Sequence, residues 1–514
     1  MRSLLLTLLT LTTLTTLLTL PTPTHAVQPY ITTAYSHTLA EKIKEGSLAT
    51  LHDVFTATPL PDIAGKASAF VGDIDYALRS LLLQSVTLSA VDLQFVAPNT
   101  LRVTSSDLAA AASFHWSYKE AAWPHVGDGG SGSAYLSSTA IALSITLEKD
   151  PTTGLPSIAV STPDVTVGKL DVRLSGGASW LYSFVLNVFK SKVVSHLQSA
   201  LQSALHDAFQ EQAKALLAST PHLLSVGDVA GIPVGLVDLS LVADPVIDPA
   251  FIRIAHLGRI ADPNPPHALH QPTVPVAPLP DLTSGKDVQI ALSMGVLNSD
   301  FQYLYDSHGL DMTFTSLPAS SPIQLVVSNI KEMIPPLGKY FKDDQAITVD
   351  LSLDHAPNVT ARGDLGTIAL DVHASLTFSI LPQGAKPDSG AASVYAFTLG
   401  ALFSTSASFG LTKAGDSGAT LLTGSVKGLD VDLALRRSAI GAFDPTVASQ
   451  FSNFALHRIL VPSLNSYLST GYPLPLSPGL SLTAPQLSIV DGAILIQSGV
   501  DLSPQFLAHL LDGE

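Results

Sequence analysis

The chain has 514 residues, of which 46% are apolar and only 13% are charged, with a formal net charge of −16 and no cysteine. Its length exceeds one ordinary domain core, so we expect two domains. The acidic balance and the lack of any Lys/Arg run argue against a duplex nucleic-acid binder, and the lack of cysteine means that packing, not disulfides, stabilises the fold.

The N-terminus has the pattern of a secretory signal peptide. Arg2 precedes a Leu/Thr run from Leu4 to Leu20, and small residues stand at Thr24 and Ala26, where a signal peptidase would cleave. We therefore expect residues 1–26 to be removed and the mature protein to be secreted. A membrane anchor is the alternative, although the apolar run is short for a spanning helix.

The first half is expected to begin with a helix from about Thr32 to Lys44. Alternating apolar residues from Val86 to Leu174 then predict a series of antiparallel strands. Residues 150–154 predict a turn, and the glycine-rich segment 127–133 a flexible loop.

The stretch from Gly176 to about Ser219 predicts one long helix, because it contains no proline and is bounded by Gly176-Gly177 and Pro221. Its second part carries a single apolar stripe, but its first part, from Trp180 to Phe189, is apolar on nearly every side. Something apolar must cover that extra surface. It is either more protein or the acyl chains of a bound lipid.

The second half repeats this plan after a proline-rich linker. We expect a helix at about 287–305, strands that include 368–380 and 429–435, and a closing helix at about 445–468. The predicted organisation is a signal peptide at 1–26, a first domain at 27–260, the linker at 261–280 and a second domain at 281–514. The matching order of elements indicates an internal duplication.

Several phrases resemble the family of bactericidal/permeability-increasing protein, lipopolysaccharide-binding protein and cholesteryl ester transfer protein. They are LPSIAVSTPDVTVGKLDVR, LSGGASWLYSFVLNVF and, near the C-terminus, IGAFDPTVASQFSNFALHRILVPSLNSYLSTGYPLPL. GGASWLY and FHWSYKEAAWPHVGDGGSG are most similar to the plant branch. The resemblance implies an α+β fold: an elongated boomerang of two similar barrel-like domains, each a strongly curved antiparallel sheet wrapped around a long helix, joined by a central sheet and the linker.

The resemblance also implies a tubular lipid pocket in each domain. The lining residues that it suggests are Ile31, Tyr35, Leu39, Ile43, Trp180, Leu181, Phe184, Val188 and Phe189 in the first domain, and Phe451, Phe454, Ile459 and Leu464 in the second. Two features depart from the family. The cysteines of its usual disulfide are missing, and the cationic tip of its lipopolysaccharide-binding members is reduced to scattered Lys66, Arg102 and Lys119.

Other motifs favour structural explanations. Residues 415–418 copy a serine-protease nucleophile segment, but nothing else of that family is present. His267 and His270 lack further ligands for a metal, and His206-Asp207 fits a solvated helix face. Trp116 and Trp123 fit an aromatic core. Asn358 begins an Asn-Val-Thr glycosylation acceptor.

We therefore expect a non-enzymatic lipid-binding protein with no cofactor and no metal, which holds phospholipid or lipopolysaccharide acyl chains in innate defence. Contact with a membrane surface is compatible with this function. The alternatives are a carrier that transfers lipid between membranes and a structural or adhesive protein with no ligand. A secreted hydrolase would need a nucleophile and base that the sequence does not offer, and the oligomeric state stays open.

Overall fold

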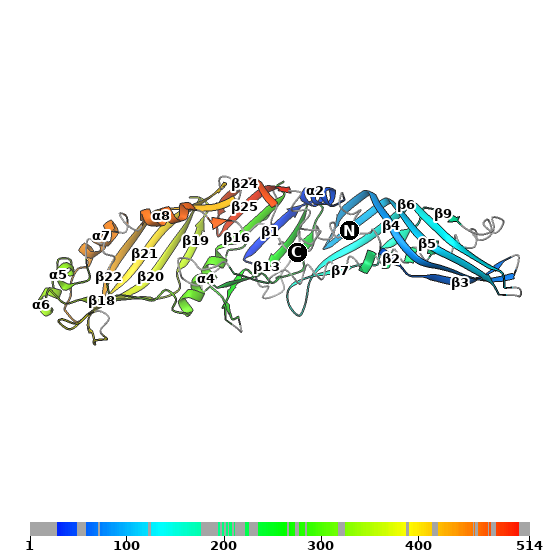
Figure 1. The fold of residues 1–514 in the computed structure, drawn as a ribbon. Coiled ribbons are helices and arrows are strands. Elements are labelled where there is room, and N and C mark those ends of the chain that lie inside the picture. Colours follow the sequence, from blue (N-terminus) through cyan, green and yellow to red (C-terminus); the bar gives the residue numbers. More distant parts are fainter. Residues whose placement is uncertain are drawn as a thin grey trace.

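The computed structural model describes most of the chain beyond the predicted signal peptide. The described residues are 28–48, 58–69, 72–121, 125–175, 222–225, 235–264, 267–272, 277–282, 285–316, 324–386, 390–413, 420–455, 461–470, 472–473 and 480–502, with His457 and several positions between 194 and 210. The molecule is elongated, with one curved sheet at each end and a smaller sheet between them (Figure 1). This arrangement confirms the expected two-part α+β fold.

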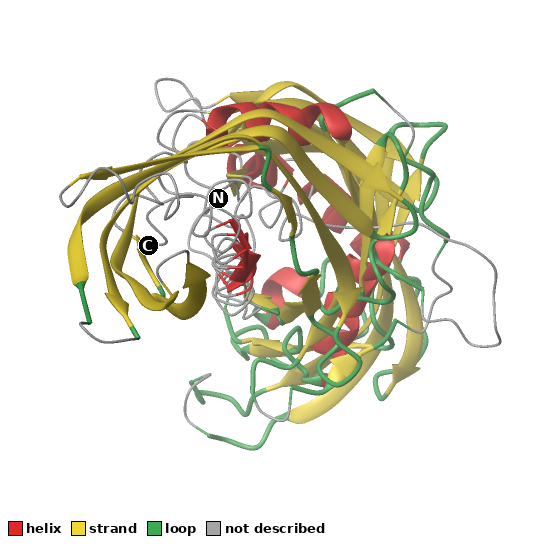
Figure 2. Ribbon diagram, turned by 90° about the vertical axis from the view of Figure 1, so that its right-hand side faces the viewer, coloured by secondary structure: helices red, strands yellow, loops and turns green. Residues whose placement is uncertain are grey.

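The sheet of the first half is antiparallel and strongly curved (Figure 2). Its three long strands β4, β5 and β6 pair in sequence, as expected for strands joined by tight connections. The strands are β2 (Thr58–Leu60), β3 (Ile63–Ala69), β4 (Gly72–Val96), β5 (Thr100–Glu120), β6 (Gly127–Lys149), β7 (Pro156–Val160), β8 (Asp164–Thr166) and β9 (Lys169–Ser175).

The sheet of the second half is built in the same way from β20, β21 and β22, again antiparallel neighbours. The short helices α5 (Val327–Ile330) and α6 (Leu337–Tyr340) cover its far end (Figure 1). The strands are β17 (Met312–Phe314), β18 (Ile347–Leu353), β19 (Asn358–Arg362), β20 (Thr367–Ile380), β21 (Val394–Lys413), β22 (Thr420–Ser438) and β23 (Tyr472–Pro473).

The central sheet contains strands from both halves, in the order β12-β13-β1-β16-β25-β24. A second small sheet beside it has the order β10-β11-β14-β15. These strands are β1 (Ile31–Ser36), β10 (Leu223–Ser225), β11 (Leu236–Asp238), β12 (Val246–Ile247), β13 (Phe251–His256), β14 (Arg259–Ala261), β15 (Leu269–His270), β16 (Val288–Ser293), β24 (Leu480–Val490) and β25 (Ala493–Leu502). The proline-rich segment therefore contributes β15, a short strand of the small sheet.

Strands β1 and β16 occupy equivalent places in the two halves. Each is followed directly by a helix, α2 (His37–Leu48) after β1 and α4 (Met294–Asp306) after β16. The middle of β1 pairs with the middle of β16 at Thr33 and Ile290. The amide of Ser36 donates to the residue before β16 at 2.9 Å, and that of Ser293 to the residue before β1 at 2.8 Å. The halves are thus related by an approximate twofold axis through this pair, which supports the predicted duplication.

Two of the predicted helices therefore start later along the chain than expected. The segments predicted as helices at 32–44 and 287–305 each begin as a strand and become helical only after a serine. The Ser36 hydroxyl accepts from the amide of Leu39 at 3.1 Å, and the Ser293 hydroxyl from that of Gly295 at 3.0 Å. Serine satisfies the free amides of a helix start, so each helix begins there. β1 was missed because nearly all of it is buried and its sequence shows no clean alternation. In β16 the residues Val288, Ile290 and Leu292 do alternate, but this short pattern was read as part of the following helix.

The glycine-rich segment 127–133, expected to be a flexible loop, is instead the start of β6. It pairs with β5 on one side, and Ser131 to Ser133 pair with β9 on the other. Glycine is needed here because neighbouring groups leave no room for a Cβ: one built at Gly132 would lie 2.5 Å from the Phe114 ring. The composition suggested a loop, but packing between strands is the reason for the glycines.

The remaining helices agree in part with expectation. The closing helix is divided into α7 (Thr446–Ala455) and α8 (Val461–Thr470). Described positions between 194 and 210, inside the expected long helix, are helical. The part that begins at Gly176, including its all-apolar turn, lies outside the described residues.

Candidate functional site

The inner face of the first sheet is an extended apolar surface. Inward residues of β5 alternate with exposed ones, and they join inward residues of β4 and β6 in one cluster. Leu205, from the described part of the long helix, is 3% exposed and belongs to the same cluster, and Val194 packs against it. The helix therefore lies against the concave side of the sheet.

Tyr35 and Leu39, two predicted lining residues, lie at the inner end of this surface. They are 1% and 2% exposed and belong to the same cluster. Burial raises the pKa of Tyr35 well above its ordinary value, so the phenol is neutral. Ile31 is only half-buried and packs against a different cluster, formed by β11, β14 and α4. The structure does not bring Ile31 together with Leu39.

The other predicted lining residues are not placed by the structure. Ile43 lies in α2, Phe451 and Phe454 lie in α7, and Leu464 lies in α8, but their side chains are not described. Five more from the long helix, and one after α7, lie outside the described residues: Trp180, Leu181, Phe184, Val188, Phe189 and Ile459.

Toward the far end of the first sheet, the inner face is aromatic. Phe114, Trp116 and Tyr118 of β5 are each less than 10% exposed. The Trp116 and Tyr118 rings are parallel, with centroids 6.2 Å apart. The Trp116 indole N–H donates to the carbonyl of Ser131 at 3.1 Å. These contacts fix the rings, and Trp116 is thus part of the apolar face, as its sequence context indicated.

Glycines of β6 let these rings lie flat against the sheet. A Cβ at Gly130 would lie 3.1 Å from the Trp116 indole nitrogen, and one at Gly132 would lie 2.5 Å from the Phe114 ring. Any side chain there would push the rings away from the strand and toward the helix side. Because each ring lies over a glycine, the rings stay close to the strand backbone at this end of the sheet. We call Phe114, Trp116 and Tyr118 the aromatic floor.

The inner face of the second sheet is also apolar, but less completely covered. Phe397 is fully buried, with Phe378 stacked on it at 4.5 Å and Phe443 edge-on at 5.1 Å. Half-buried Leu376, Phe403 and Leu435 pack around this group. Both halves thus place an apolar surface on the inside of a curved sheet.

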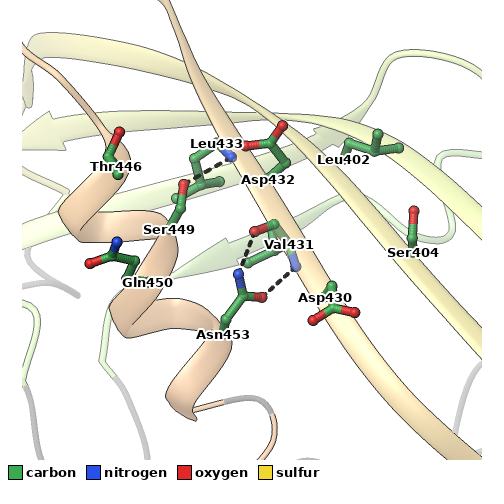
Figure 3. Close-up of a pocket in the computed structure, with 10 residues that line it drawn as sticks. All are labelled: Leu402, Ser404, Asp430, Val431, Asp432, Leu433, Thr446, Ser449, Gln450 and Asn453. Atoms are coloured by element: carbon green, nitrogen blue, oxygen red, sulfur yellow. Dashed lines mark hydrogen bonds between the residues drawn. The ribbon is translucent and has the colours of Figure 1, made fainter.

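Helices α7 and α8 lie along one edge of β22 (Figure 1). Both bond to this edge through side chains, as Figure 3 shows for α7. Asn453 accepts from the amide of Val431 at 2.6 Å and donates to its carbonyl at 2.9 Å. Asn465 makes the same two bonds to Val426, at 2.6 and 3.1 Å. The helical amides therefore satisfy backbone groups that a neighbouring strand would normally pair.

Two further contacts extend this row. The Ser449 hydroxyl accepts from the amide of Leu433 at 3.1 Å, and His457 Nε2 lies 3.1 Å from an oxygen of Asp430. Ser449 and Asn453 are four residues apart on α7 and so share one face of that helix. His457 follows four residues later, and Asn465 takes the matching position on α8. We call this row the seam. The four-residue spacing was visible in the sequence, but the prediction followed only the apolar positions of the helix.

The lengths of helix and strand match along the seam. Within α7, a helix rises about 6 Å from residue 449 to 453, and β22 extends about 7 Å from residue 431 to 433. The polar side chains therefore reach the β22 edge in register. The match requires the helices to run opposite to β22.

A pocket of about 340 Å³ lies at the seam, between α7 and the edge of β22 (Figure 3). Asp430, Asp432 and Ser404 line it from the exposed face of the sheet. Val431 and Leu433, members of the buried cluster of the second half, line it from the apolar face. The pocket therefore extends around the strand edge from a polar surface to an apolar one.

The motifs judged structural in the sequence have structural partners where they are described. His267 contacts the carbonyl of Asp262 at 2.8 Å, and His270 lies 2.9 Å from Asp306. Asp207 is exposed, as a solvated helix face requires, but His206 is half-buried and its Nδ1 is buried. Trp123 and residues 415–418 lie outside the described residues. Asn358 is the first residue of β19 and is half-buried.

Within the part of the chain that the structure describes, no three His, Asp or Glu side chains are grouped so that they could hold a metal ion. The described helices are all too short or too polar to cross a membrane. What the geometry offers is two apolar inner faces and a pocket at a strand edge. These features suit the burial of apolar groups.

Two family models match in tandem: the N-terminal domain of the LBP / BPI / CETP family at residues 41–211 and its C-terminal domain at 233–502. The chain belongs to this family. Lipopolysaccharide-binding protein of Mus musculus is 26% identical over 86% of this chain and 87% of its own length. A BPI/LBP family protein of Arabidopsis thaliana is 22% identical over 84% of each chain.

The fold has a solved counterpart in the crystal structure of a lipopolysaccharide-binding protein. That structure matches 93% of this chain and 100% of its own, with a TM-score of 0.52 and 21% identity. The likeness confirms the architecture inferred from the sequence resemblance.

Proposed function

We propose that this protein binds amphipathic lipids, phospholipid or lipopolysaccharide, by burying their acyl chains between its curved sheets and the helices on their inner sides. The observation that carries the proposal is the continuous apolar inner face of the first sheet, on which both Leu205 of the helix and Leu39 of α2 pack. Each buried methylene contributes about 0.8 kcal/mol. Acyl chains can therefore be held without specific polar contacts, and the proposed role includes no catalysis.

Acyl chains, and not the phosphates of lipid A, are the part of the ligand that this protein suits best. At the far end of the first sheet, exposed Lys66 lies 3.6 Å from Asp75. Burial raises the pKa of Tyr118, and the negative charges of Asp128 and Glu120 raise it further. Acidic groups thus offset the few cations there, which disfavours a phosphate-binding tip.

Organic extraction of the purified protein followed by mass spectrometry tests the proposal. We expect phospholipid or lipopolysaccharide in the extract, at up to two molecules per chain if both halves are filled. A clean extract, together with no uptake from lipid vesicles, would leave a structural or adhesive role without a ligand.

A carrier of lipid between membranes is the second candidate, because an apolar interior that accepts lipid can also release it. Donor and acceptor vesicles with a labelled phospholipid distinguish the two roles. A sensor retains its lipid over the assay, whereas a carrier moves label to the acceptor in a protein-dependent manner.

We propose that the protein acts outside the cell in innate defence, after residues 1–26 are removed. It would meet its ligand at a bacterial or membrane surface. Asn358, half-buried at the start of β19, is the candidate for glycosylation. A glycosidase-sensitive mass increase that is lost in Asn358→Gln would establish the modification and passage through the secretory pathway.

A further inference from the structure

The curved sheet of the second half forms the wall around its apolar interior. In this wall, backbone pairing is extensive on one edge of β22 and sparse on the other. β20 pairs with β21 from Ile368–Ala407 to Ile380–Val394, and β21 pairs with β22 from Phe397–Ser438 to Lys413–Thr420. On the other edge of β22, strand β23 pairs only with Leu421 and Leu422. Among the described residues beyond that point, the seam supplies the hydrogen bonds to this edge.

Side-chain bonds at the seam separate more easily than a backbone ladder. When the helix moves away, the Asn453 and Asn465 amides and the backbone groups at Val426 and Val431 can all bond to water, so no polar group is left buried and unpaired. Opening between β20 and β21 would break a long cooperative ladder instead. The seam is therefore the weakest part of the described wall.

The pocket at the seam is lined by residues from both faces of β22. Asp432 and Ser404 face the exposed side, whereas Val431 and Leu433 are 4% and 9% exposed and belong to the buried cluster. An amphiphile at this edge can keep its polar group in water while its chains contact the apolar residues.

We propose that the seam between α7–α8 and β22 is the entrance through which the acyl chains of a glycerophospholipid reach the interior of the second half. This inference rests on the proposed lipid-binding function and adds the route to it. Separation of α7 from β22 admits the two chains past Val431 and Leu433. Return of Asn453 and Asn465 to the edge closes the wall behind them.

The first experiment weakens the seam. Asn453→Leu with Asn465→Leu keeps side chains of similar size and removes four hydrogen bonds. Phosphatidylcholine vesicles that carry a self-quenched fluorescent phosphatidylcholine report uptake as dequenching. We expect one phase of uptake to become about tenfold faster. The matched control, Ser452→Ala with Ser466→Ala, lies on the same two helices outside the seam and should leave uptake unchanged.

The second experiment closes the seam and does not depend on the stability of the first variant. Because the chain has no cysteine, Asp432→Cys with Gln450→Cys places a unique pair on opposite sides of the pocket, which a short bismaleimide reagent can bridge. We expect the bridged protein to lose the phase assigned to the second half and to keep that of the first. Each single-cysteine variant, treated with the same reagent, is the control.

The outcomes separate the two proposals. If the unmodified protein takes up no phosphatidylcholine, the lipid-binding function fails and the entrance fails with it. If it takes up lipid at the same rate and to the same extent when bridged, the function stands and the entrance is wrong. Loss of one phase on bridging, with faster uptake in the leucine variant, supports both.

Discussion

Gly132 illustrates how a single position sets the shape of the inner face. It lies on β6 opposite Phe114, and the absence of a side chain lets that ring lie on the strand. The same relation holds between Gly130 and Trp116. Glycine weakens a strand, since it loses more entropy on folding than other residues. Here that cost is offset by packing of the aromatic floor.

We predict that Gly132→Ala destabilises the protein by about 1–3 kcal/mol, because the new methyl group must displace the Phe114 ring or the β6 backbone. Urea unfolding should show a lower midpoint with an unchanged slope. Gly285→Ala is the matched control, since a Cβ there meets nothing within 4 Å. Equal stability of the two variants would show that the floor has room for the methyl group.

His256 makes stability depend on pH. It is the last residue of β13, and burial lowers its pKa from 6.5 to about 4. The unfolded chain therefore binds a proton near pH 6.5 that the folded chain refuses until about pH 4, so this contribution to stability is present above pH 6.5 and is lost as the pH falls toward 4. The loss between pH 7 and pH 5 is about 2 kcal/mol.

His256→Phe removes this titration and is predicted to flatten the fall in urea midpoint between pH 7 and pH 5. His308→Phe is the control, since that ring is exposed. A parallel fall in His256→Phe and in the unsubstituted protein would assign the acid sensitivity to other groups.

At the scale of elements, the sequence predicted best where large apolar residues alternate with smaller or polar ones along a strand. The alternation from Ile368 to Ile380 predicted β20, observed as Thr367–Ile380. Alternation did not reveal β1, because this strand lies inside the central sheet and Thr32 and Thr33 are buried together with Tyr35. A period of two cannot appear where both faces are covered.

The sequence likewise predicted only part of the candidate site. In the closing helix, Ala448 belongs to the buried cluster, whereas its neighbour Val447 is exposed. The polar face carried equal information, since Ser449, Asn453 and Asn465 are positioned to meet a strand edge. Their partners are backbone groups of β22, which no pattern of residue types reveals. A contact between a side chain and a distant main chain becomes visible only in the folded structure.

Packing also occupies the place where the family resemblance would put a disulfide. Val165 of β8 is fully buried, and Leu205 of the helix is 3% exposed, both within one cluster. A disulfide stabilises largely by restricting the unfolded chain, whereas these residues act through burial in the folded state. The first half thus depends on apolar contacts between strand and helix.

At the scale of the whole molecule, the two halves share one central sheet. The central sheet places β13 and β1 of the first half beside β16 and β25 of the second. Lys42 of α2 binds Asp287 at 2.7 Å, and Asp287 accepts from the amide of Val500 at 2.9 Å. Asp287 is buried, whereas the Lys42 side chain is 43% exposed, so water partly screens this ion pair.

A cut in the chain between residues 272 and 277, on the path between the halves, tests this unity. Expressed alone, fragments 27–272 and 277–514 each expose β1 or β16 as an unpaired edge, so each should aggregate. Expressed together, they should pair through β1 and β16 and elute as one complex of full-length size in gel filtration. Two fragments that are soluble and monodisperse when separate would mean that each half folds alone, and that the central sheet is an interface between finished domains.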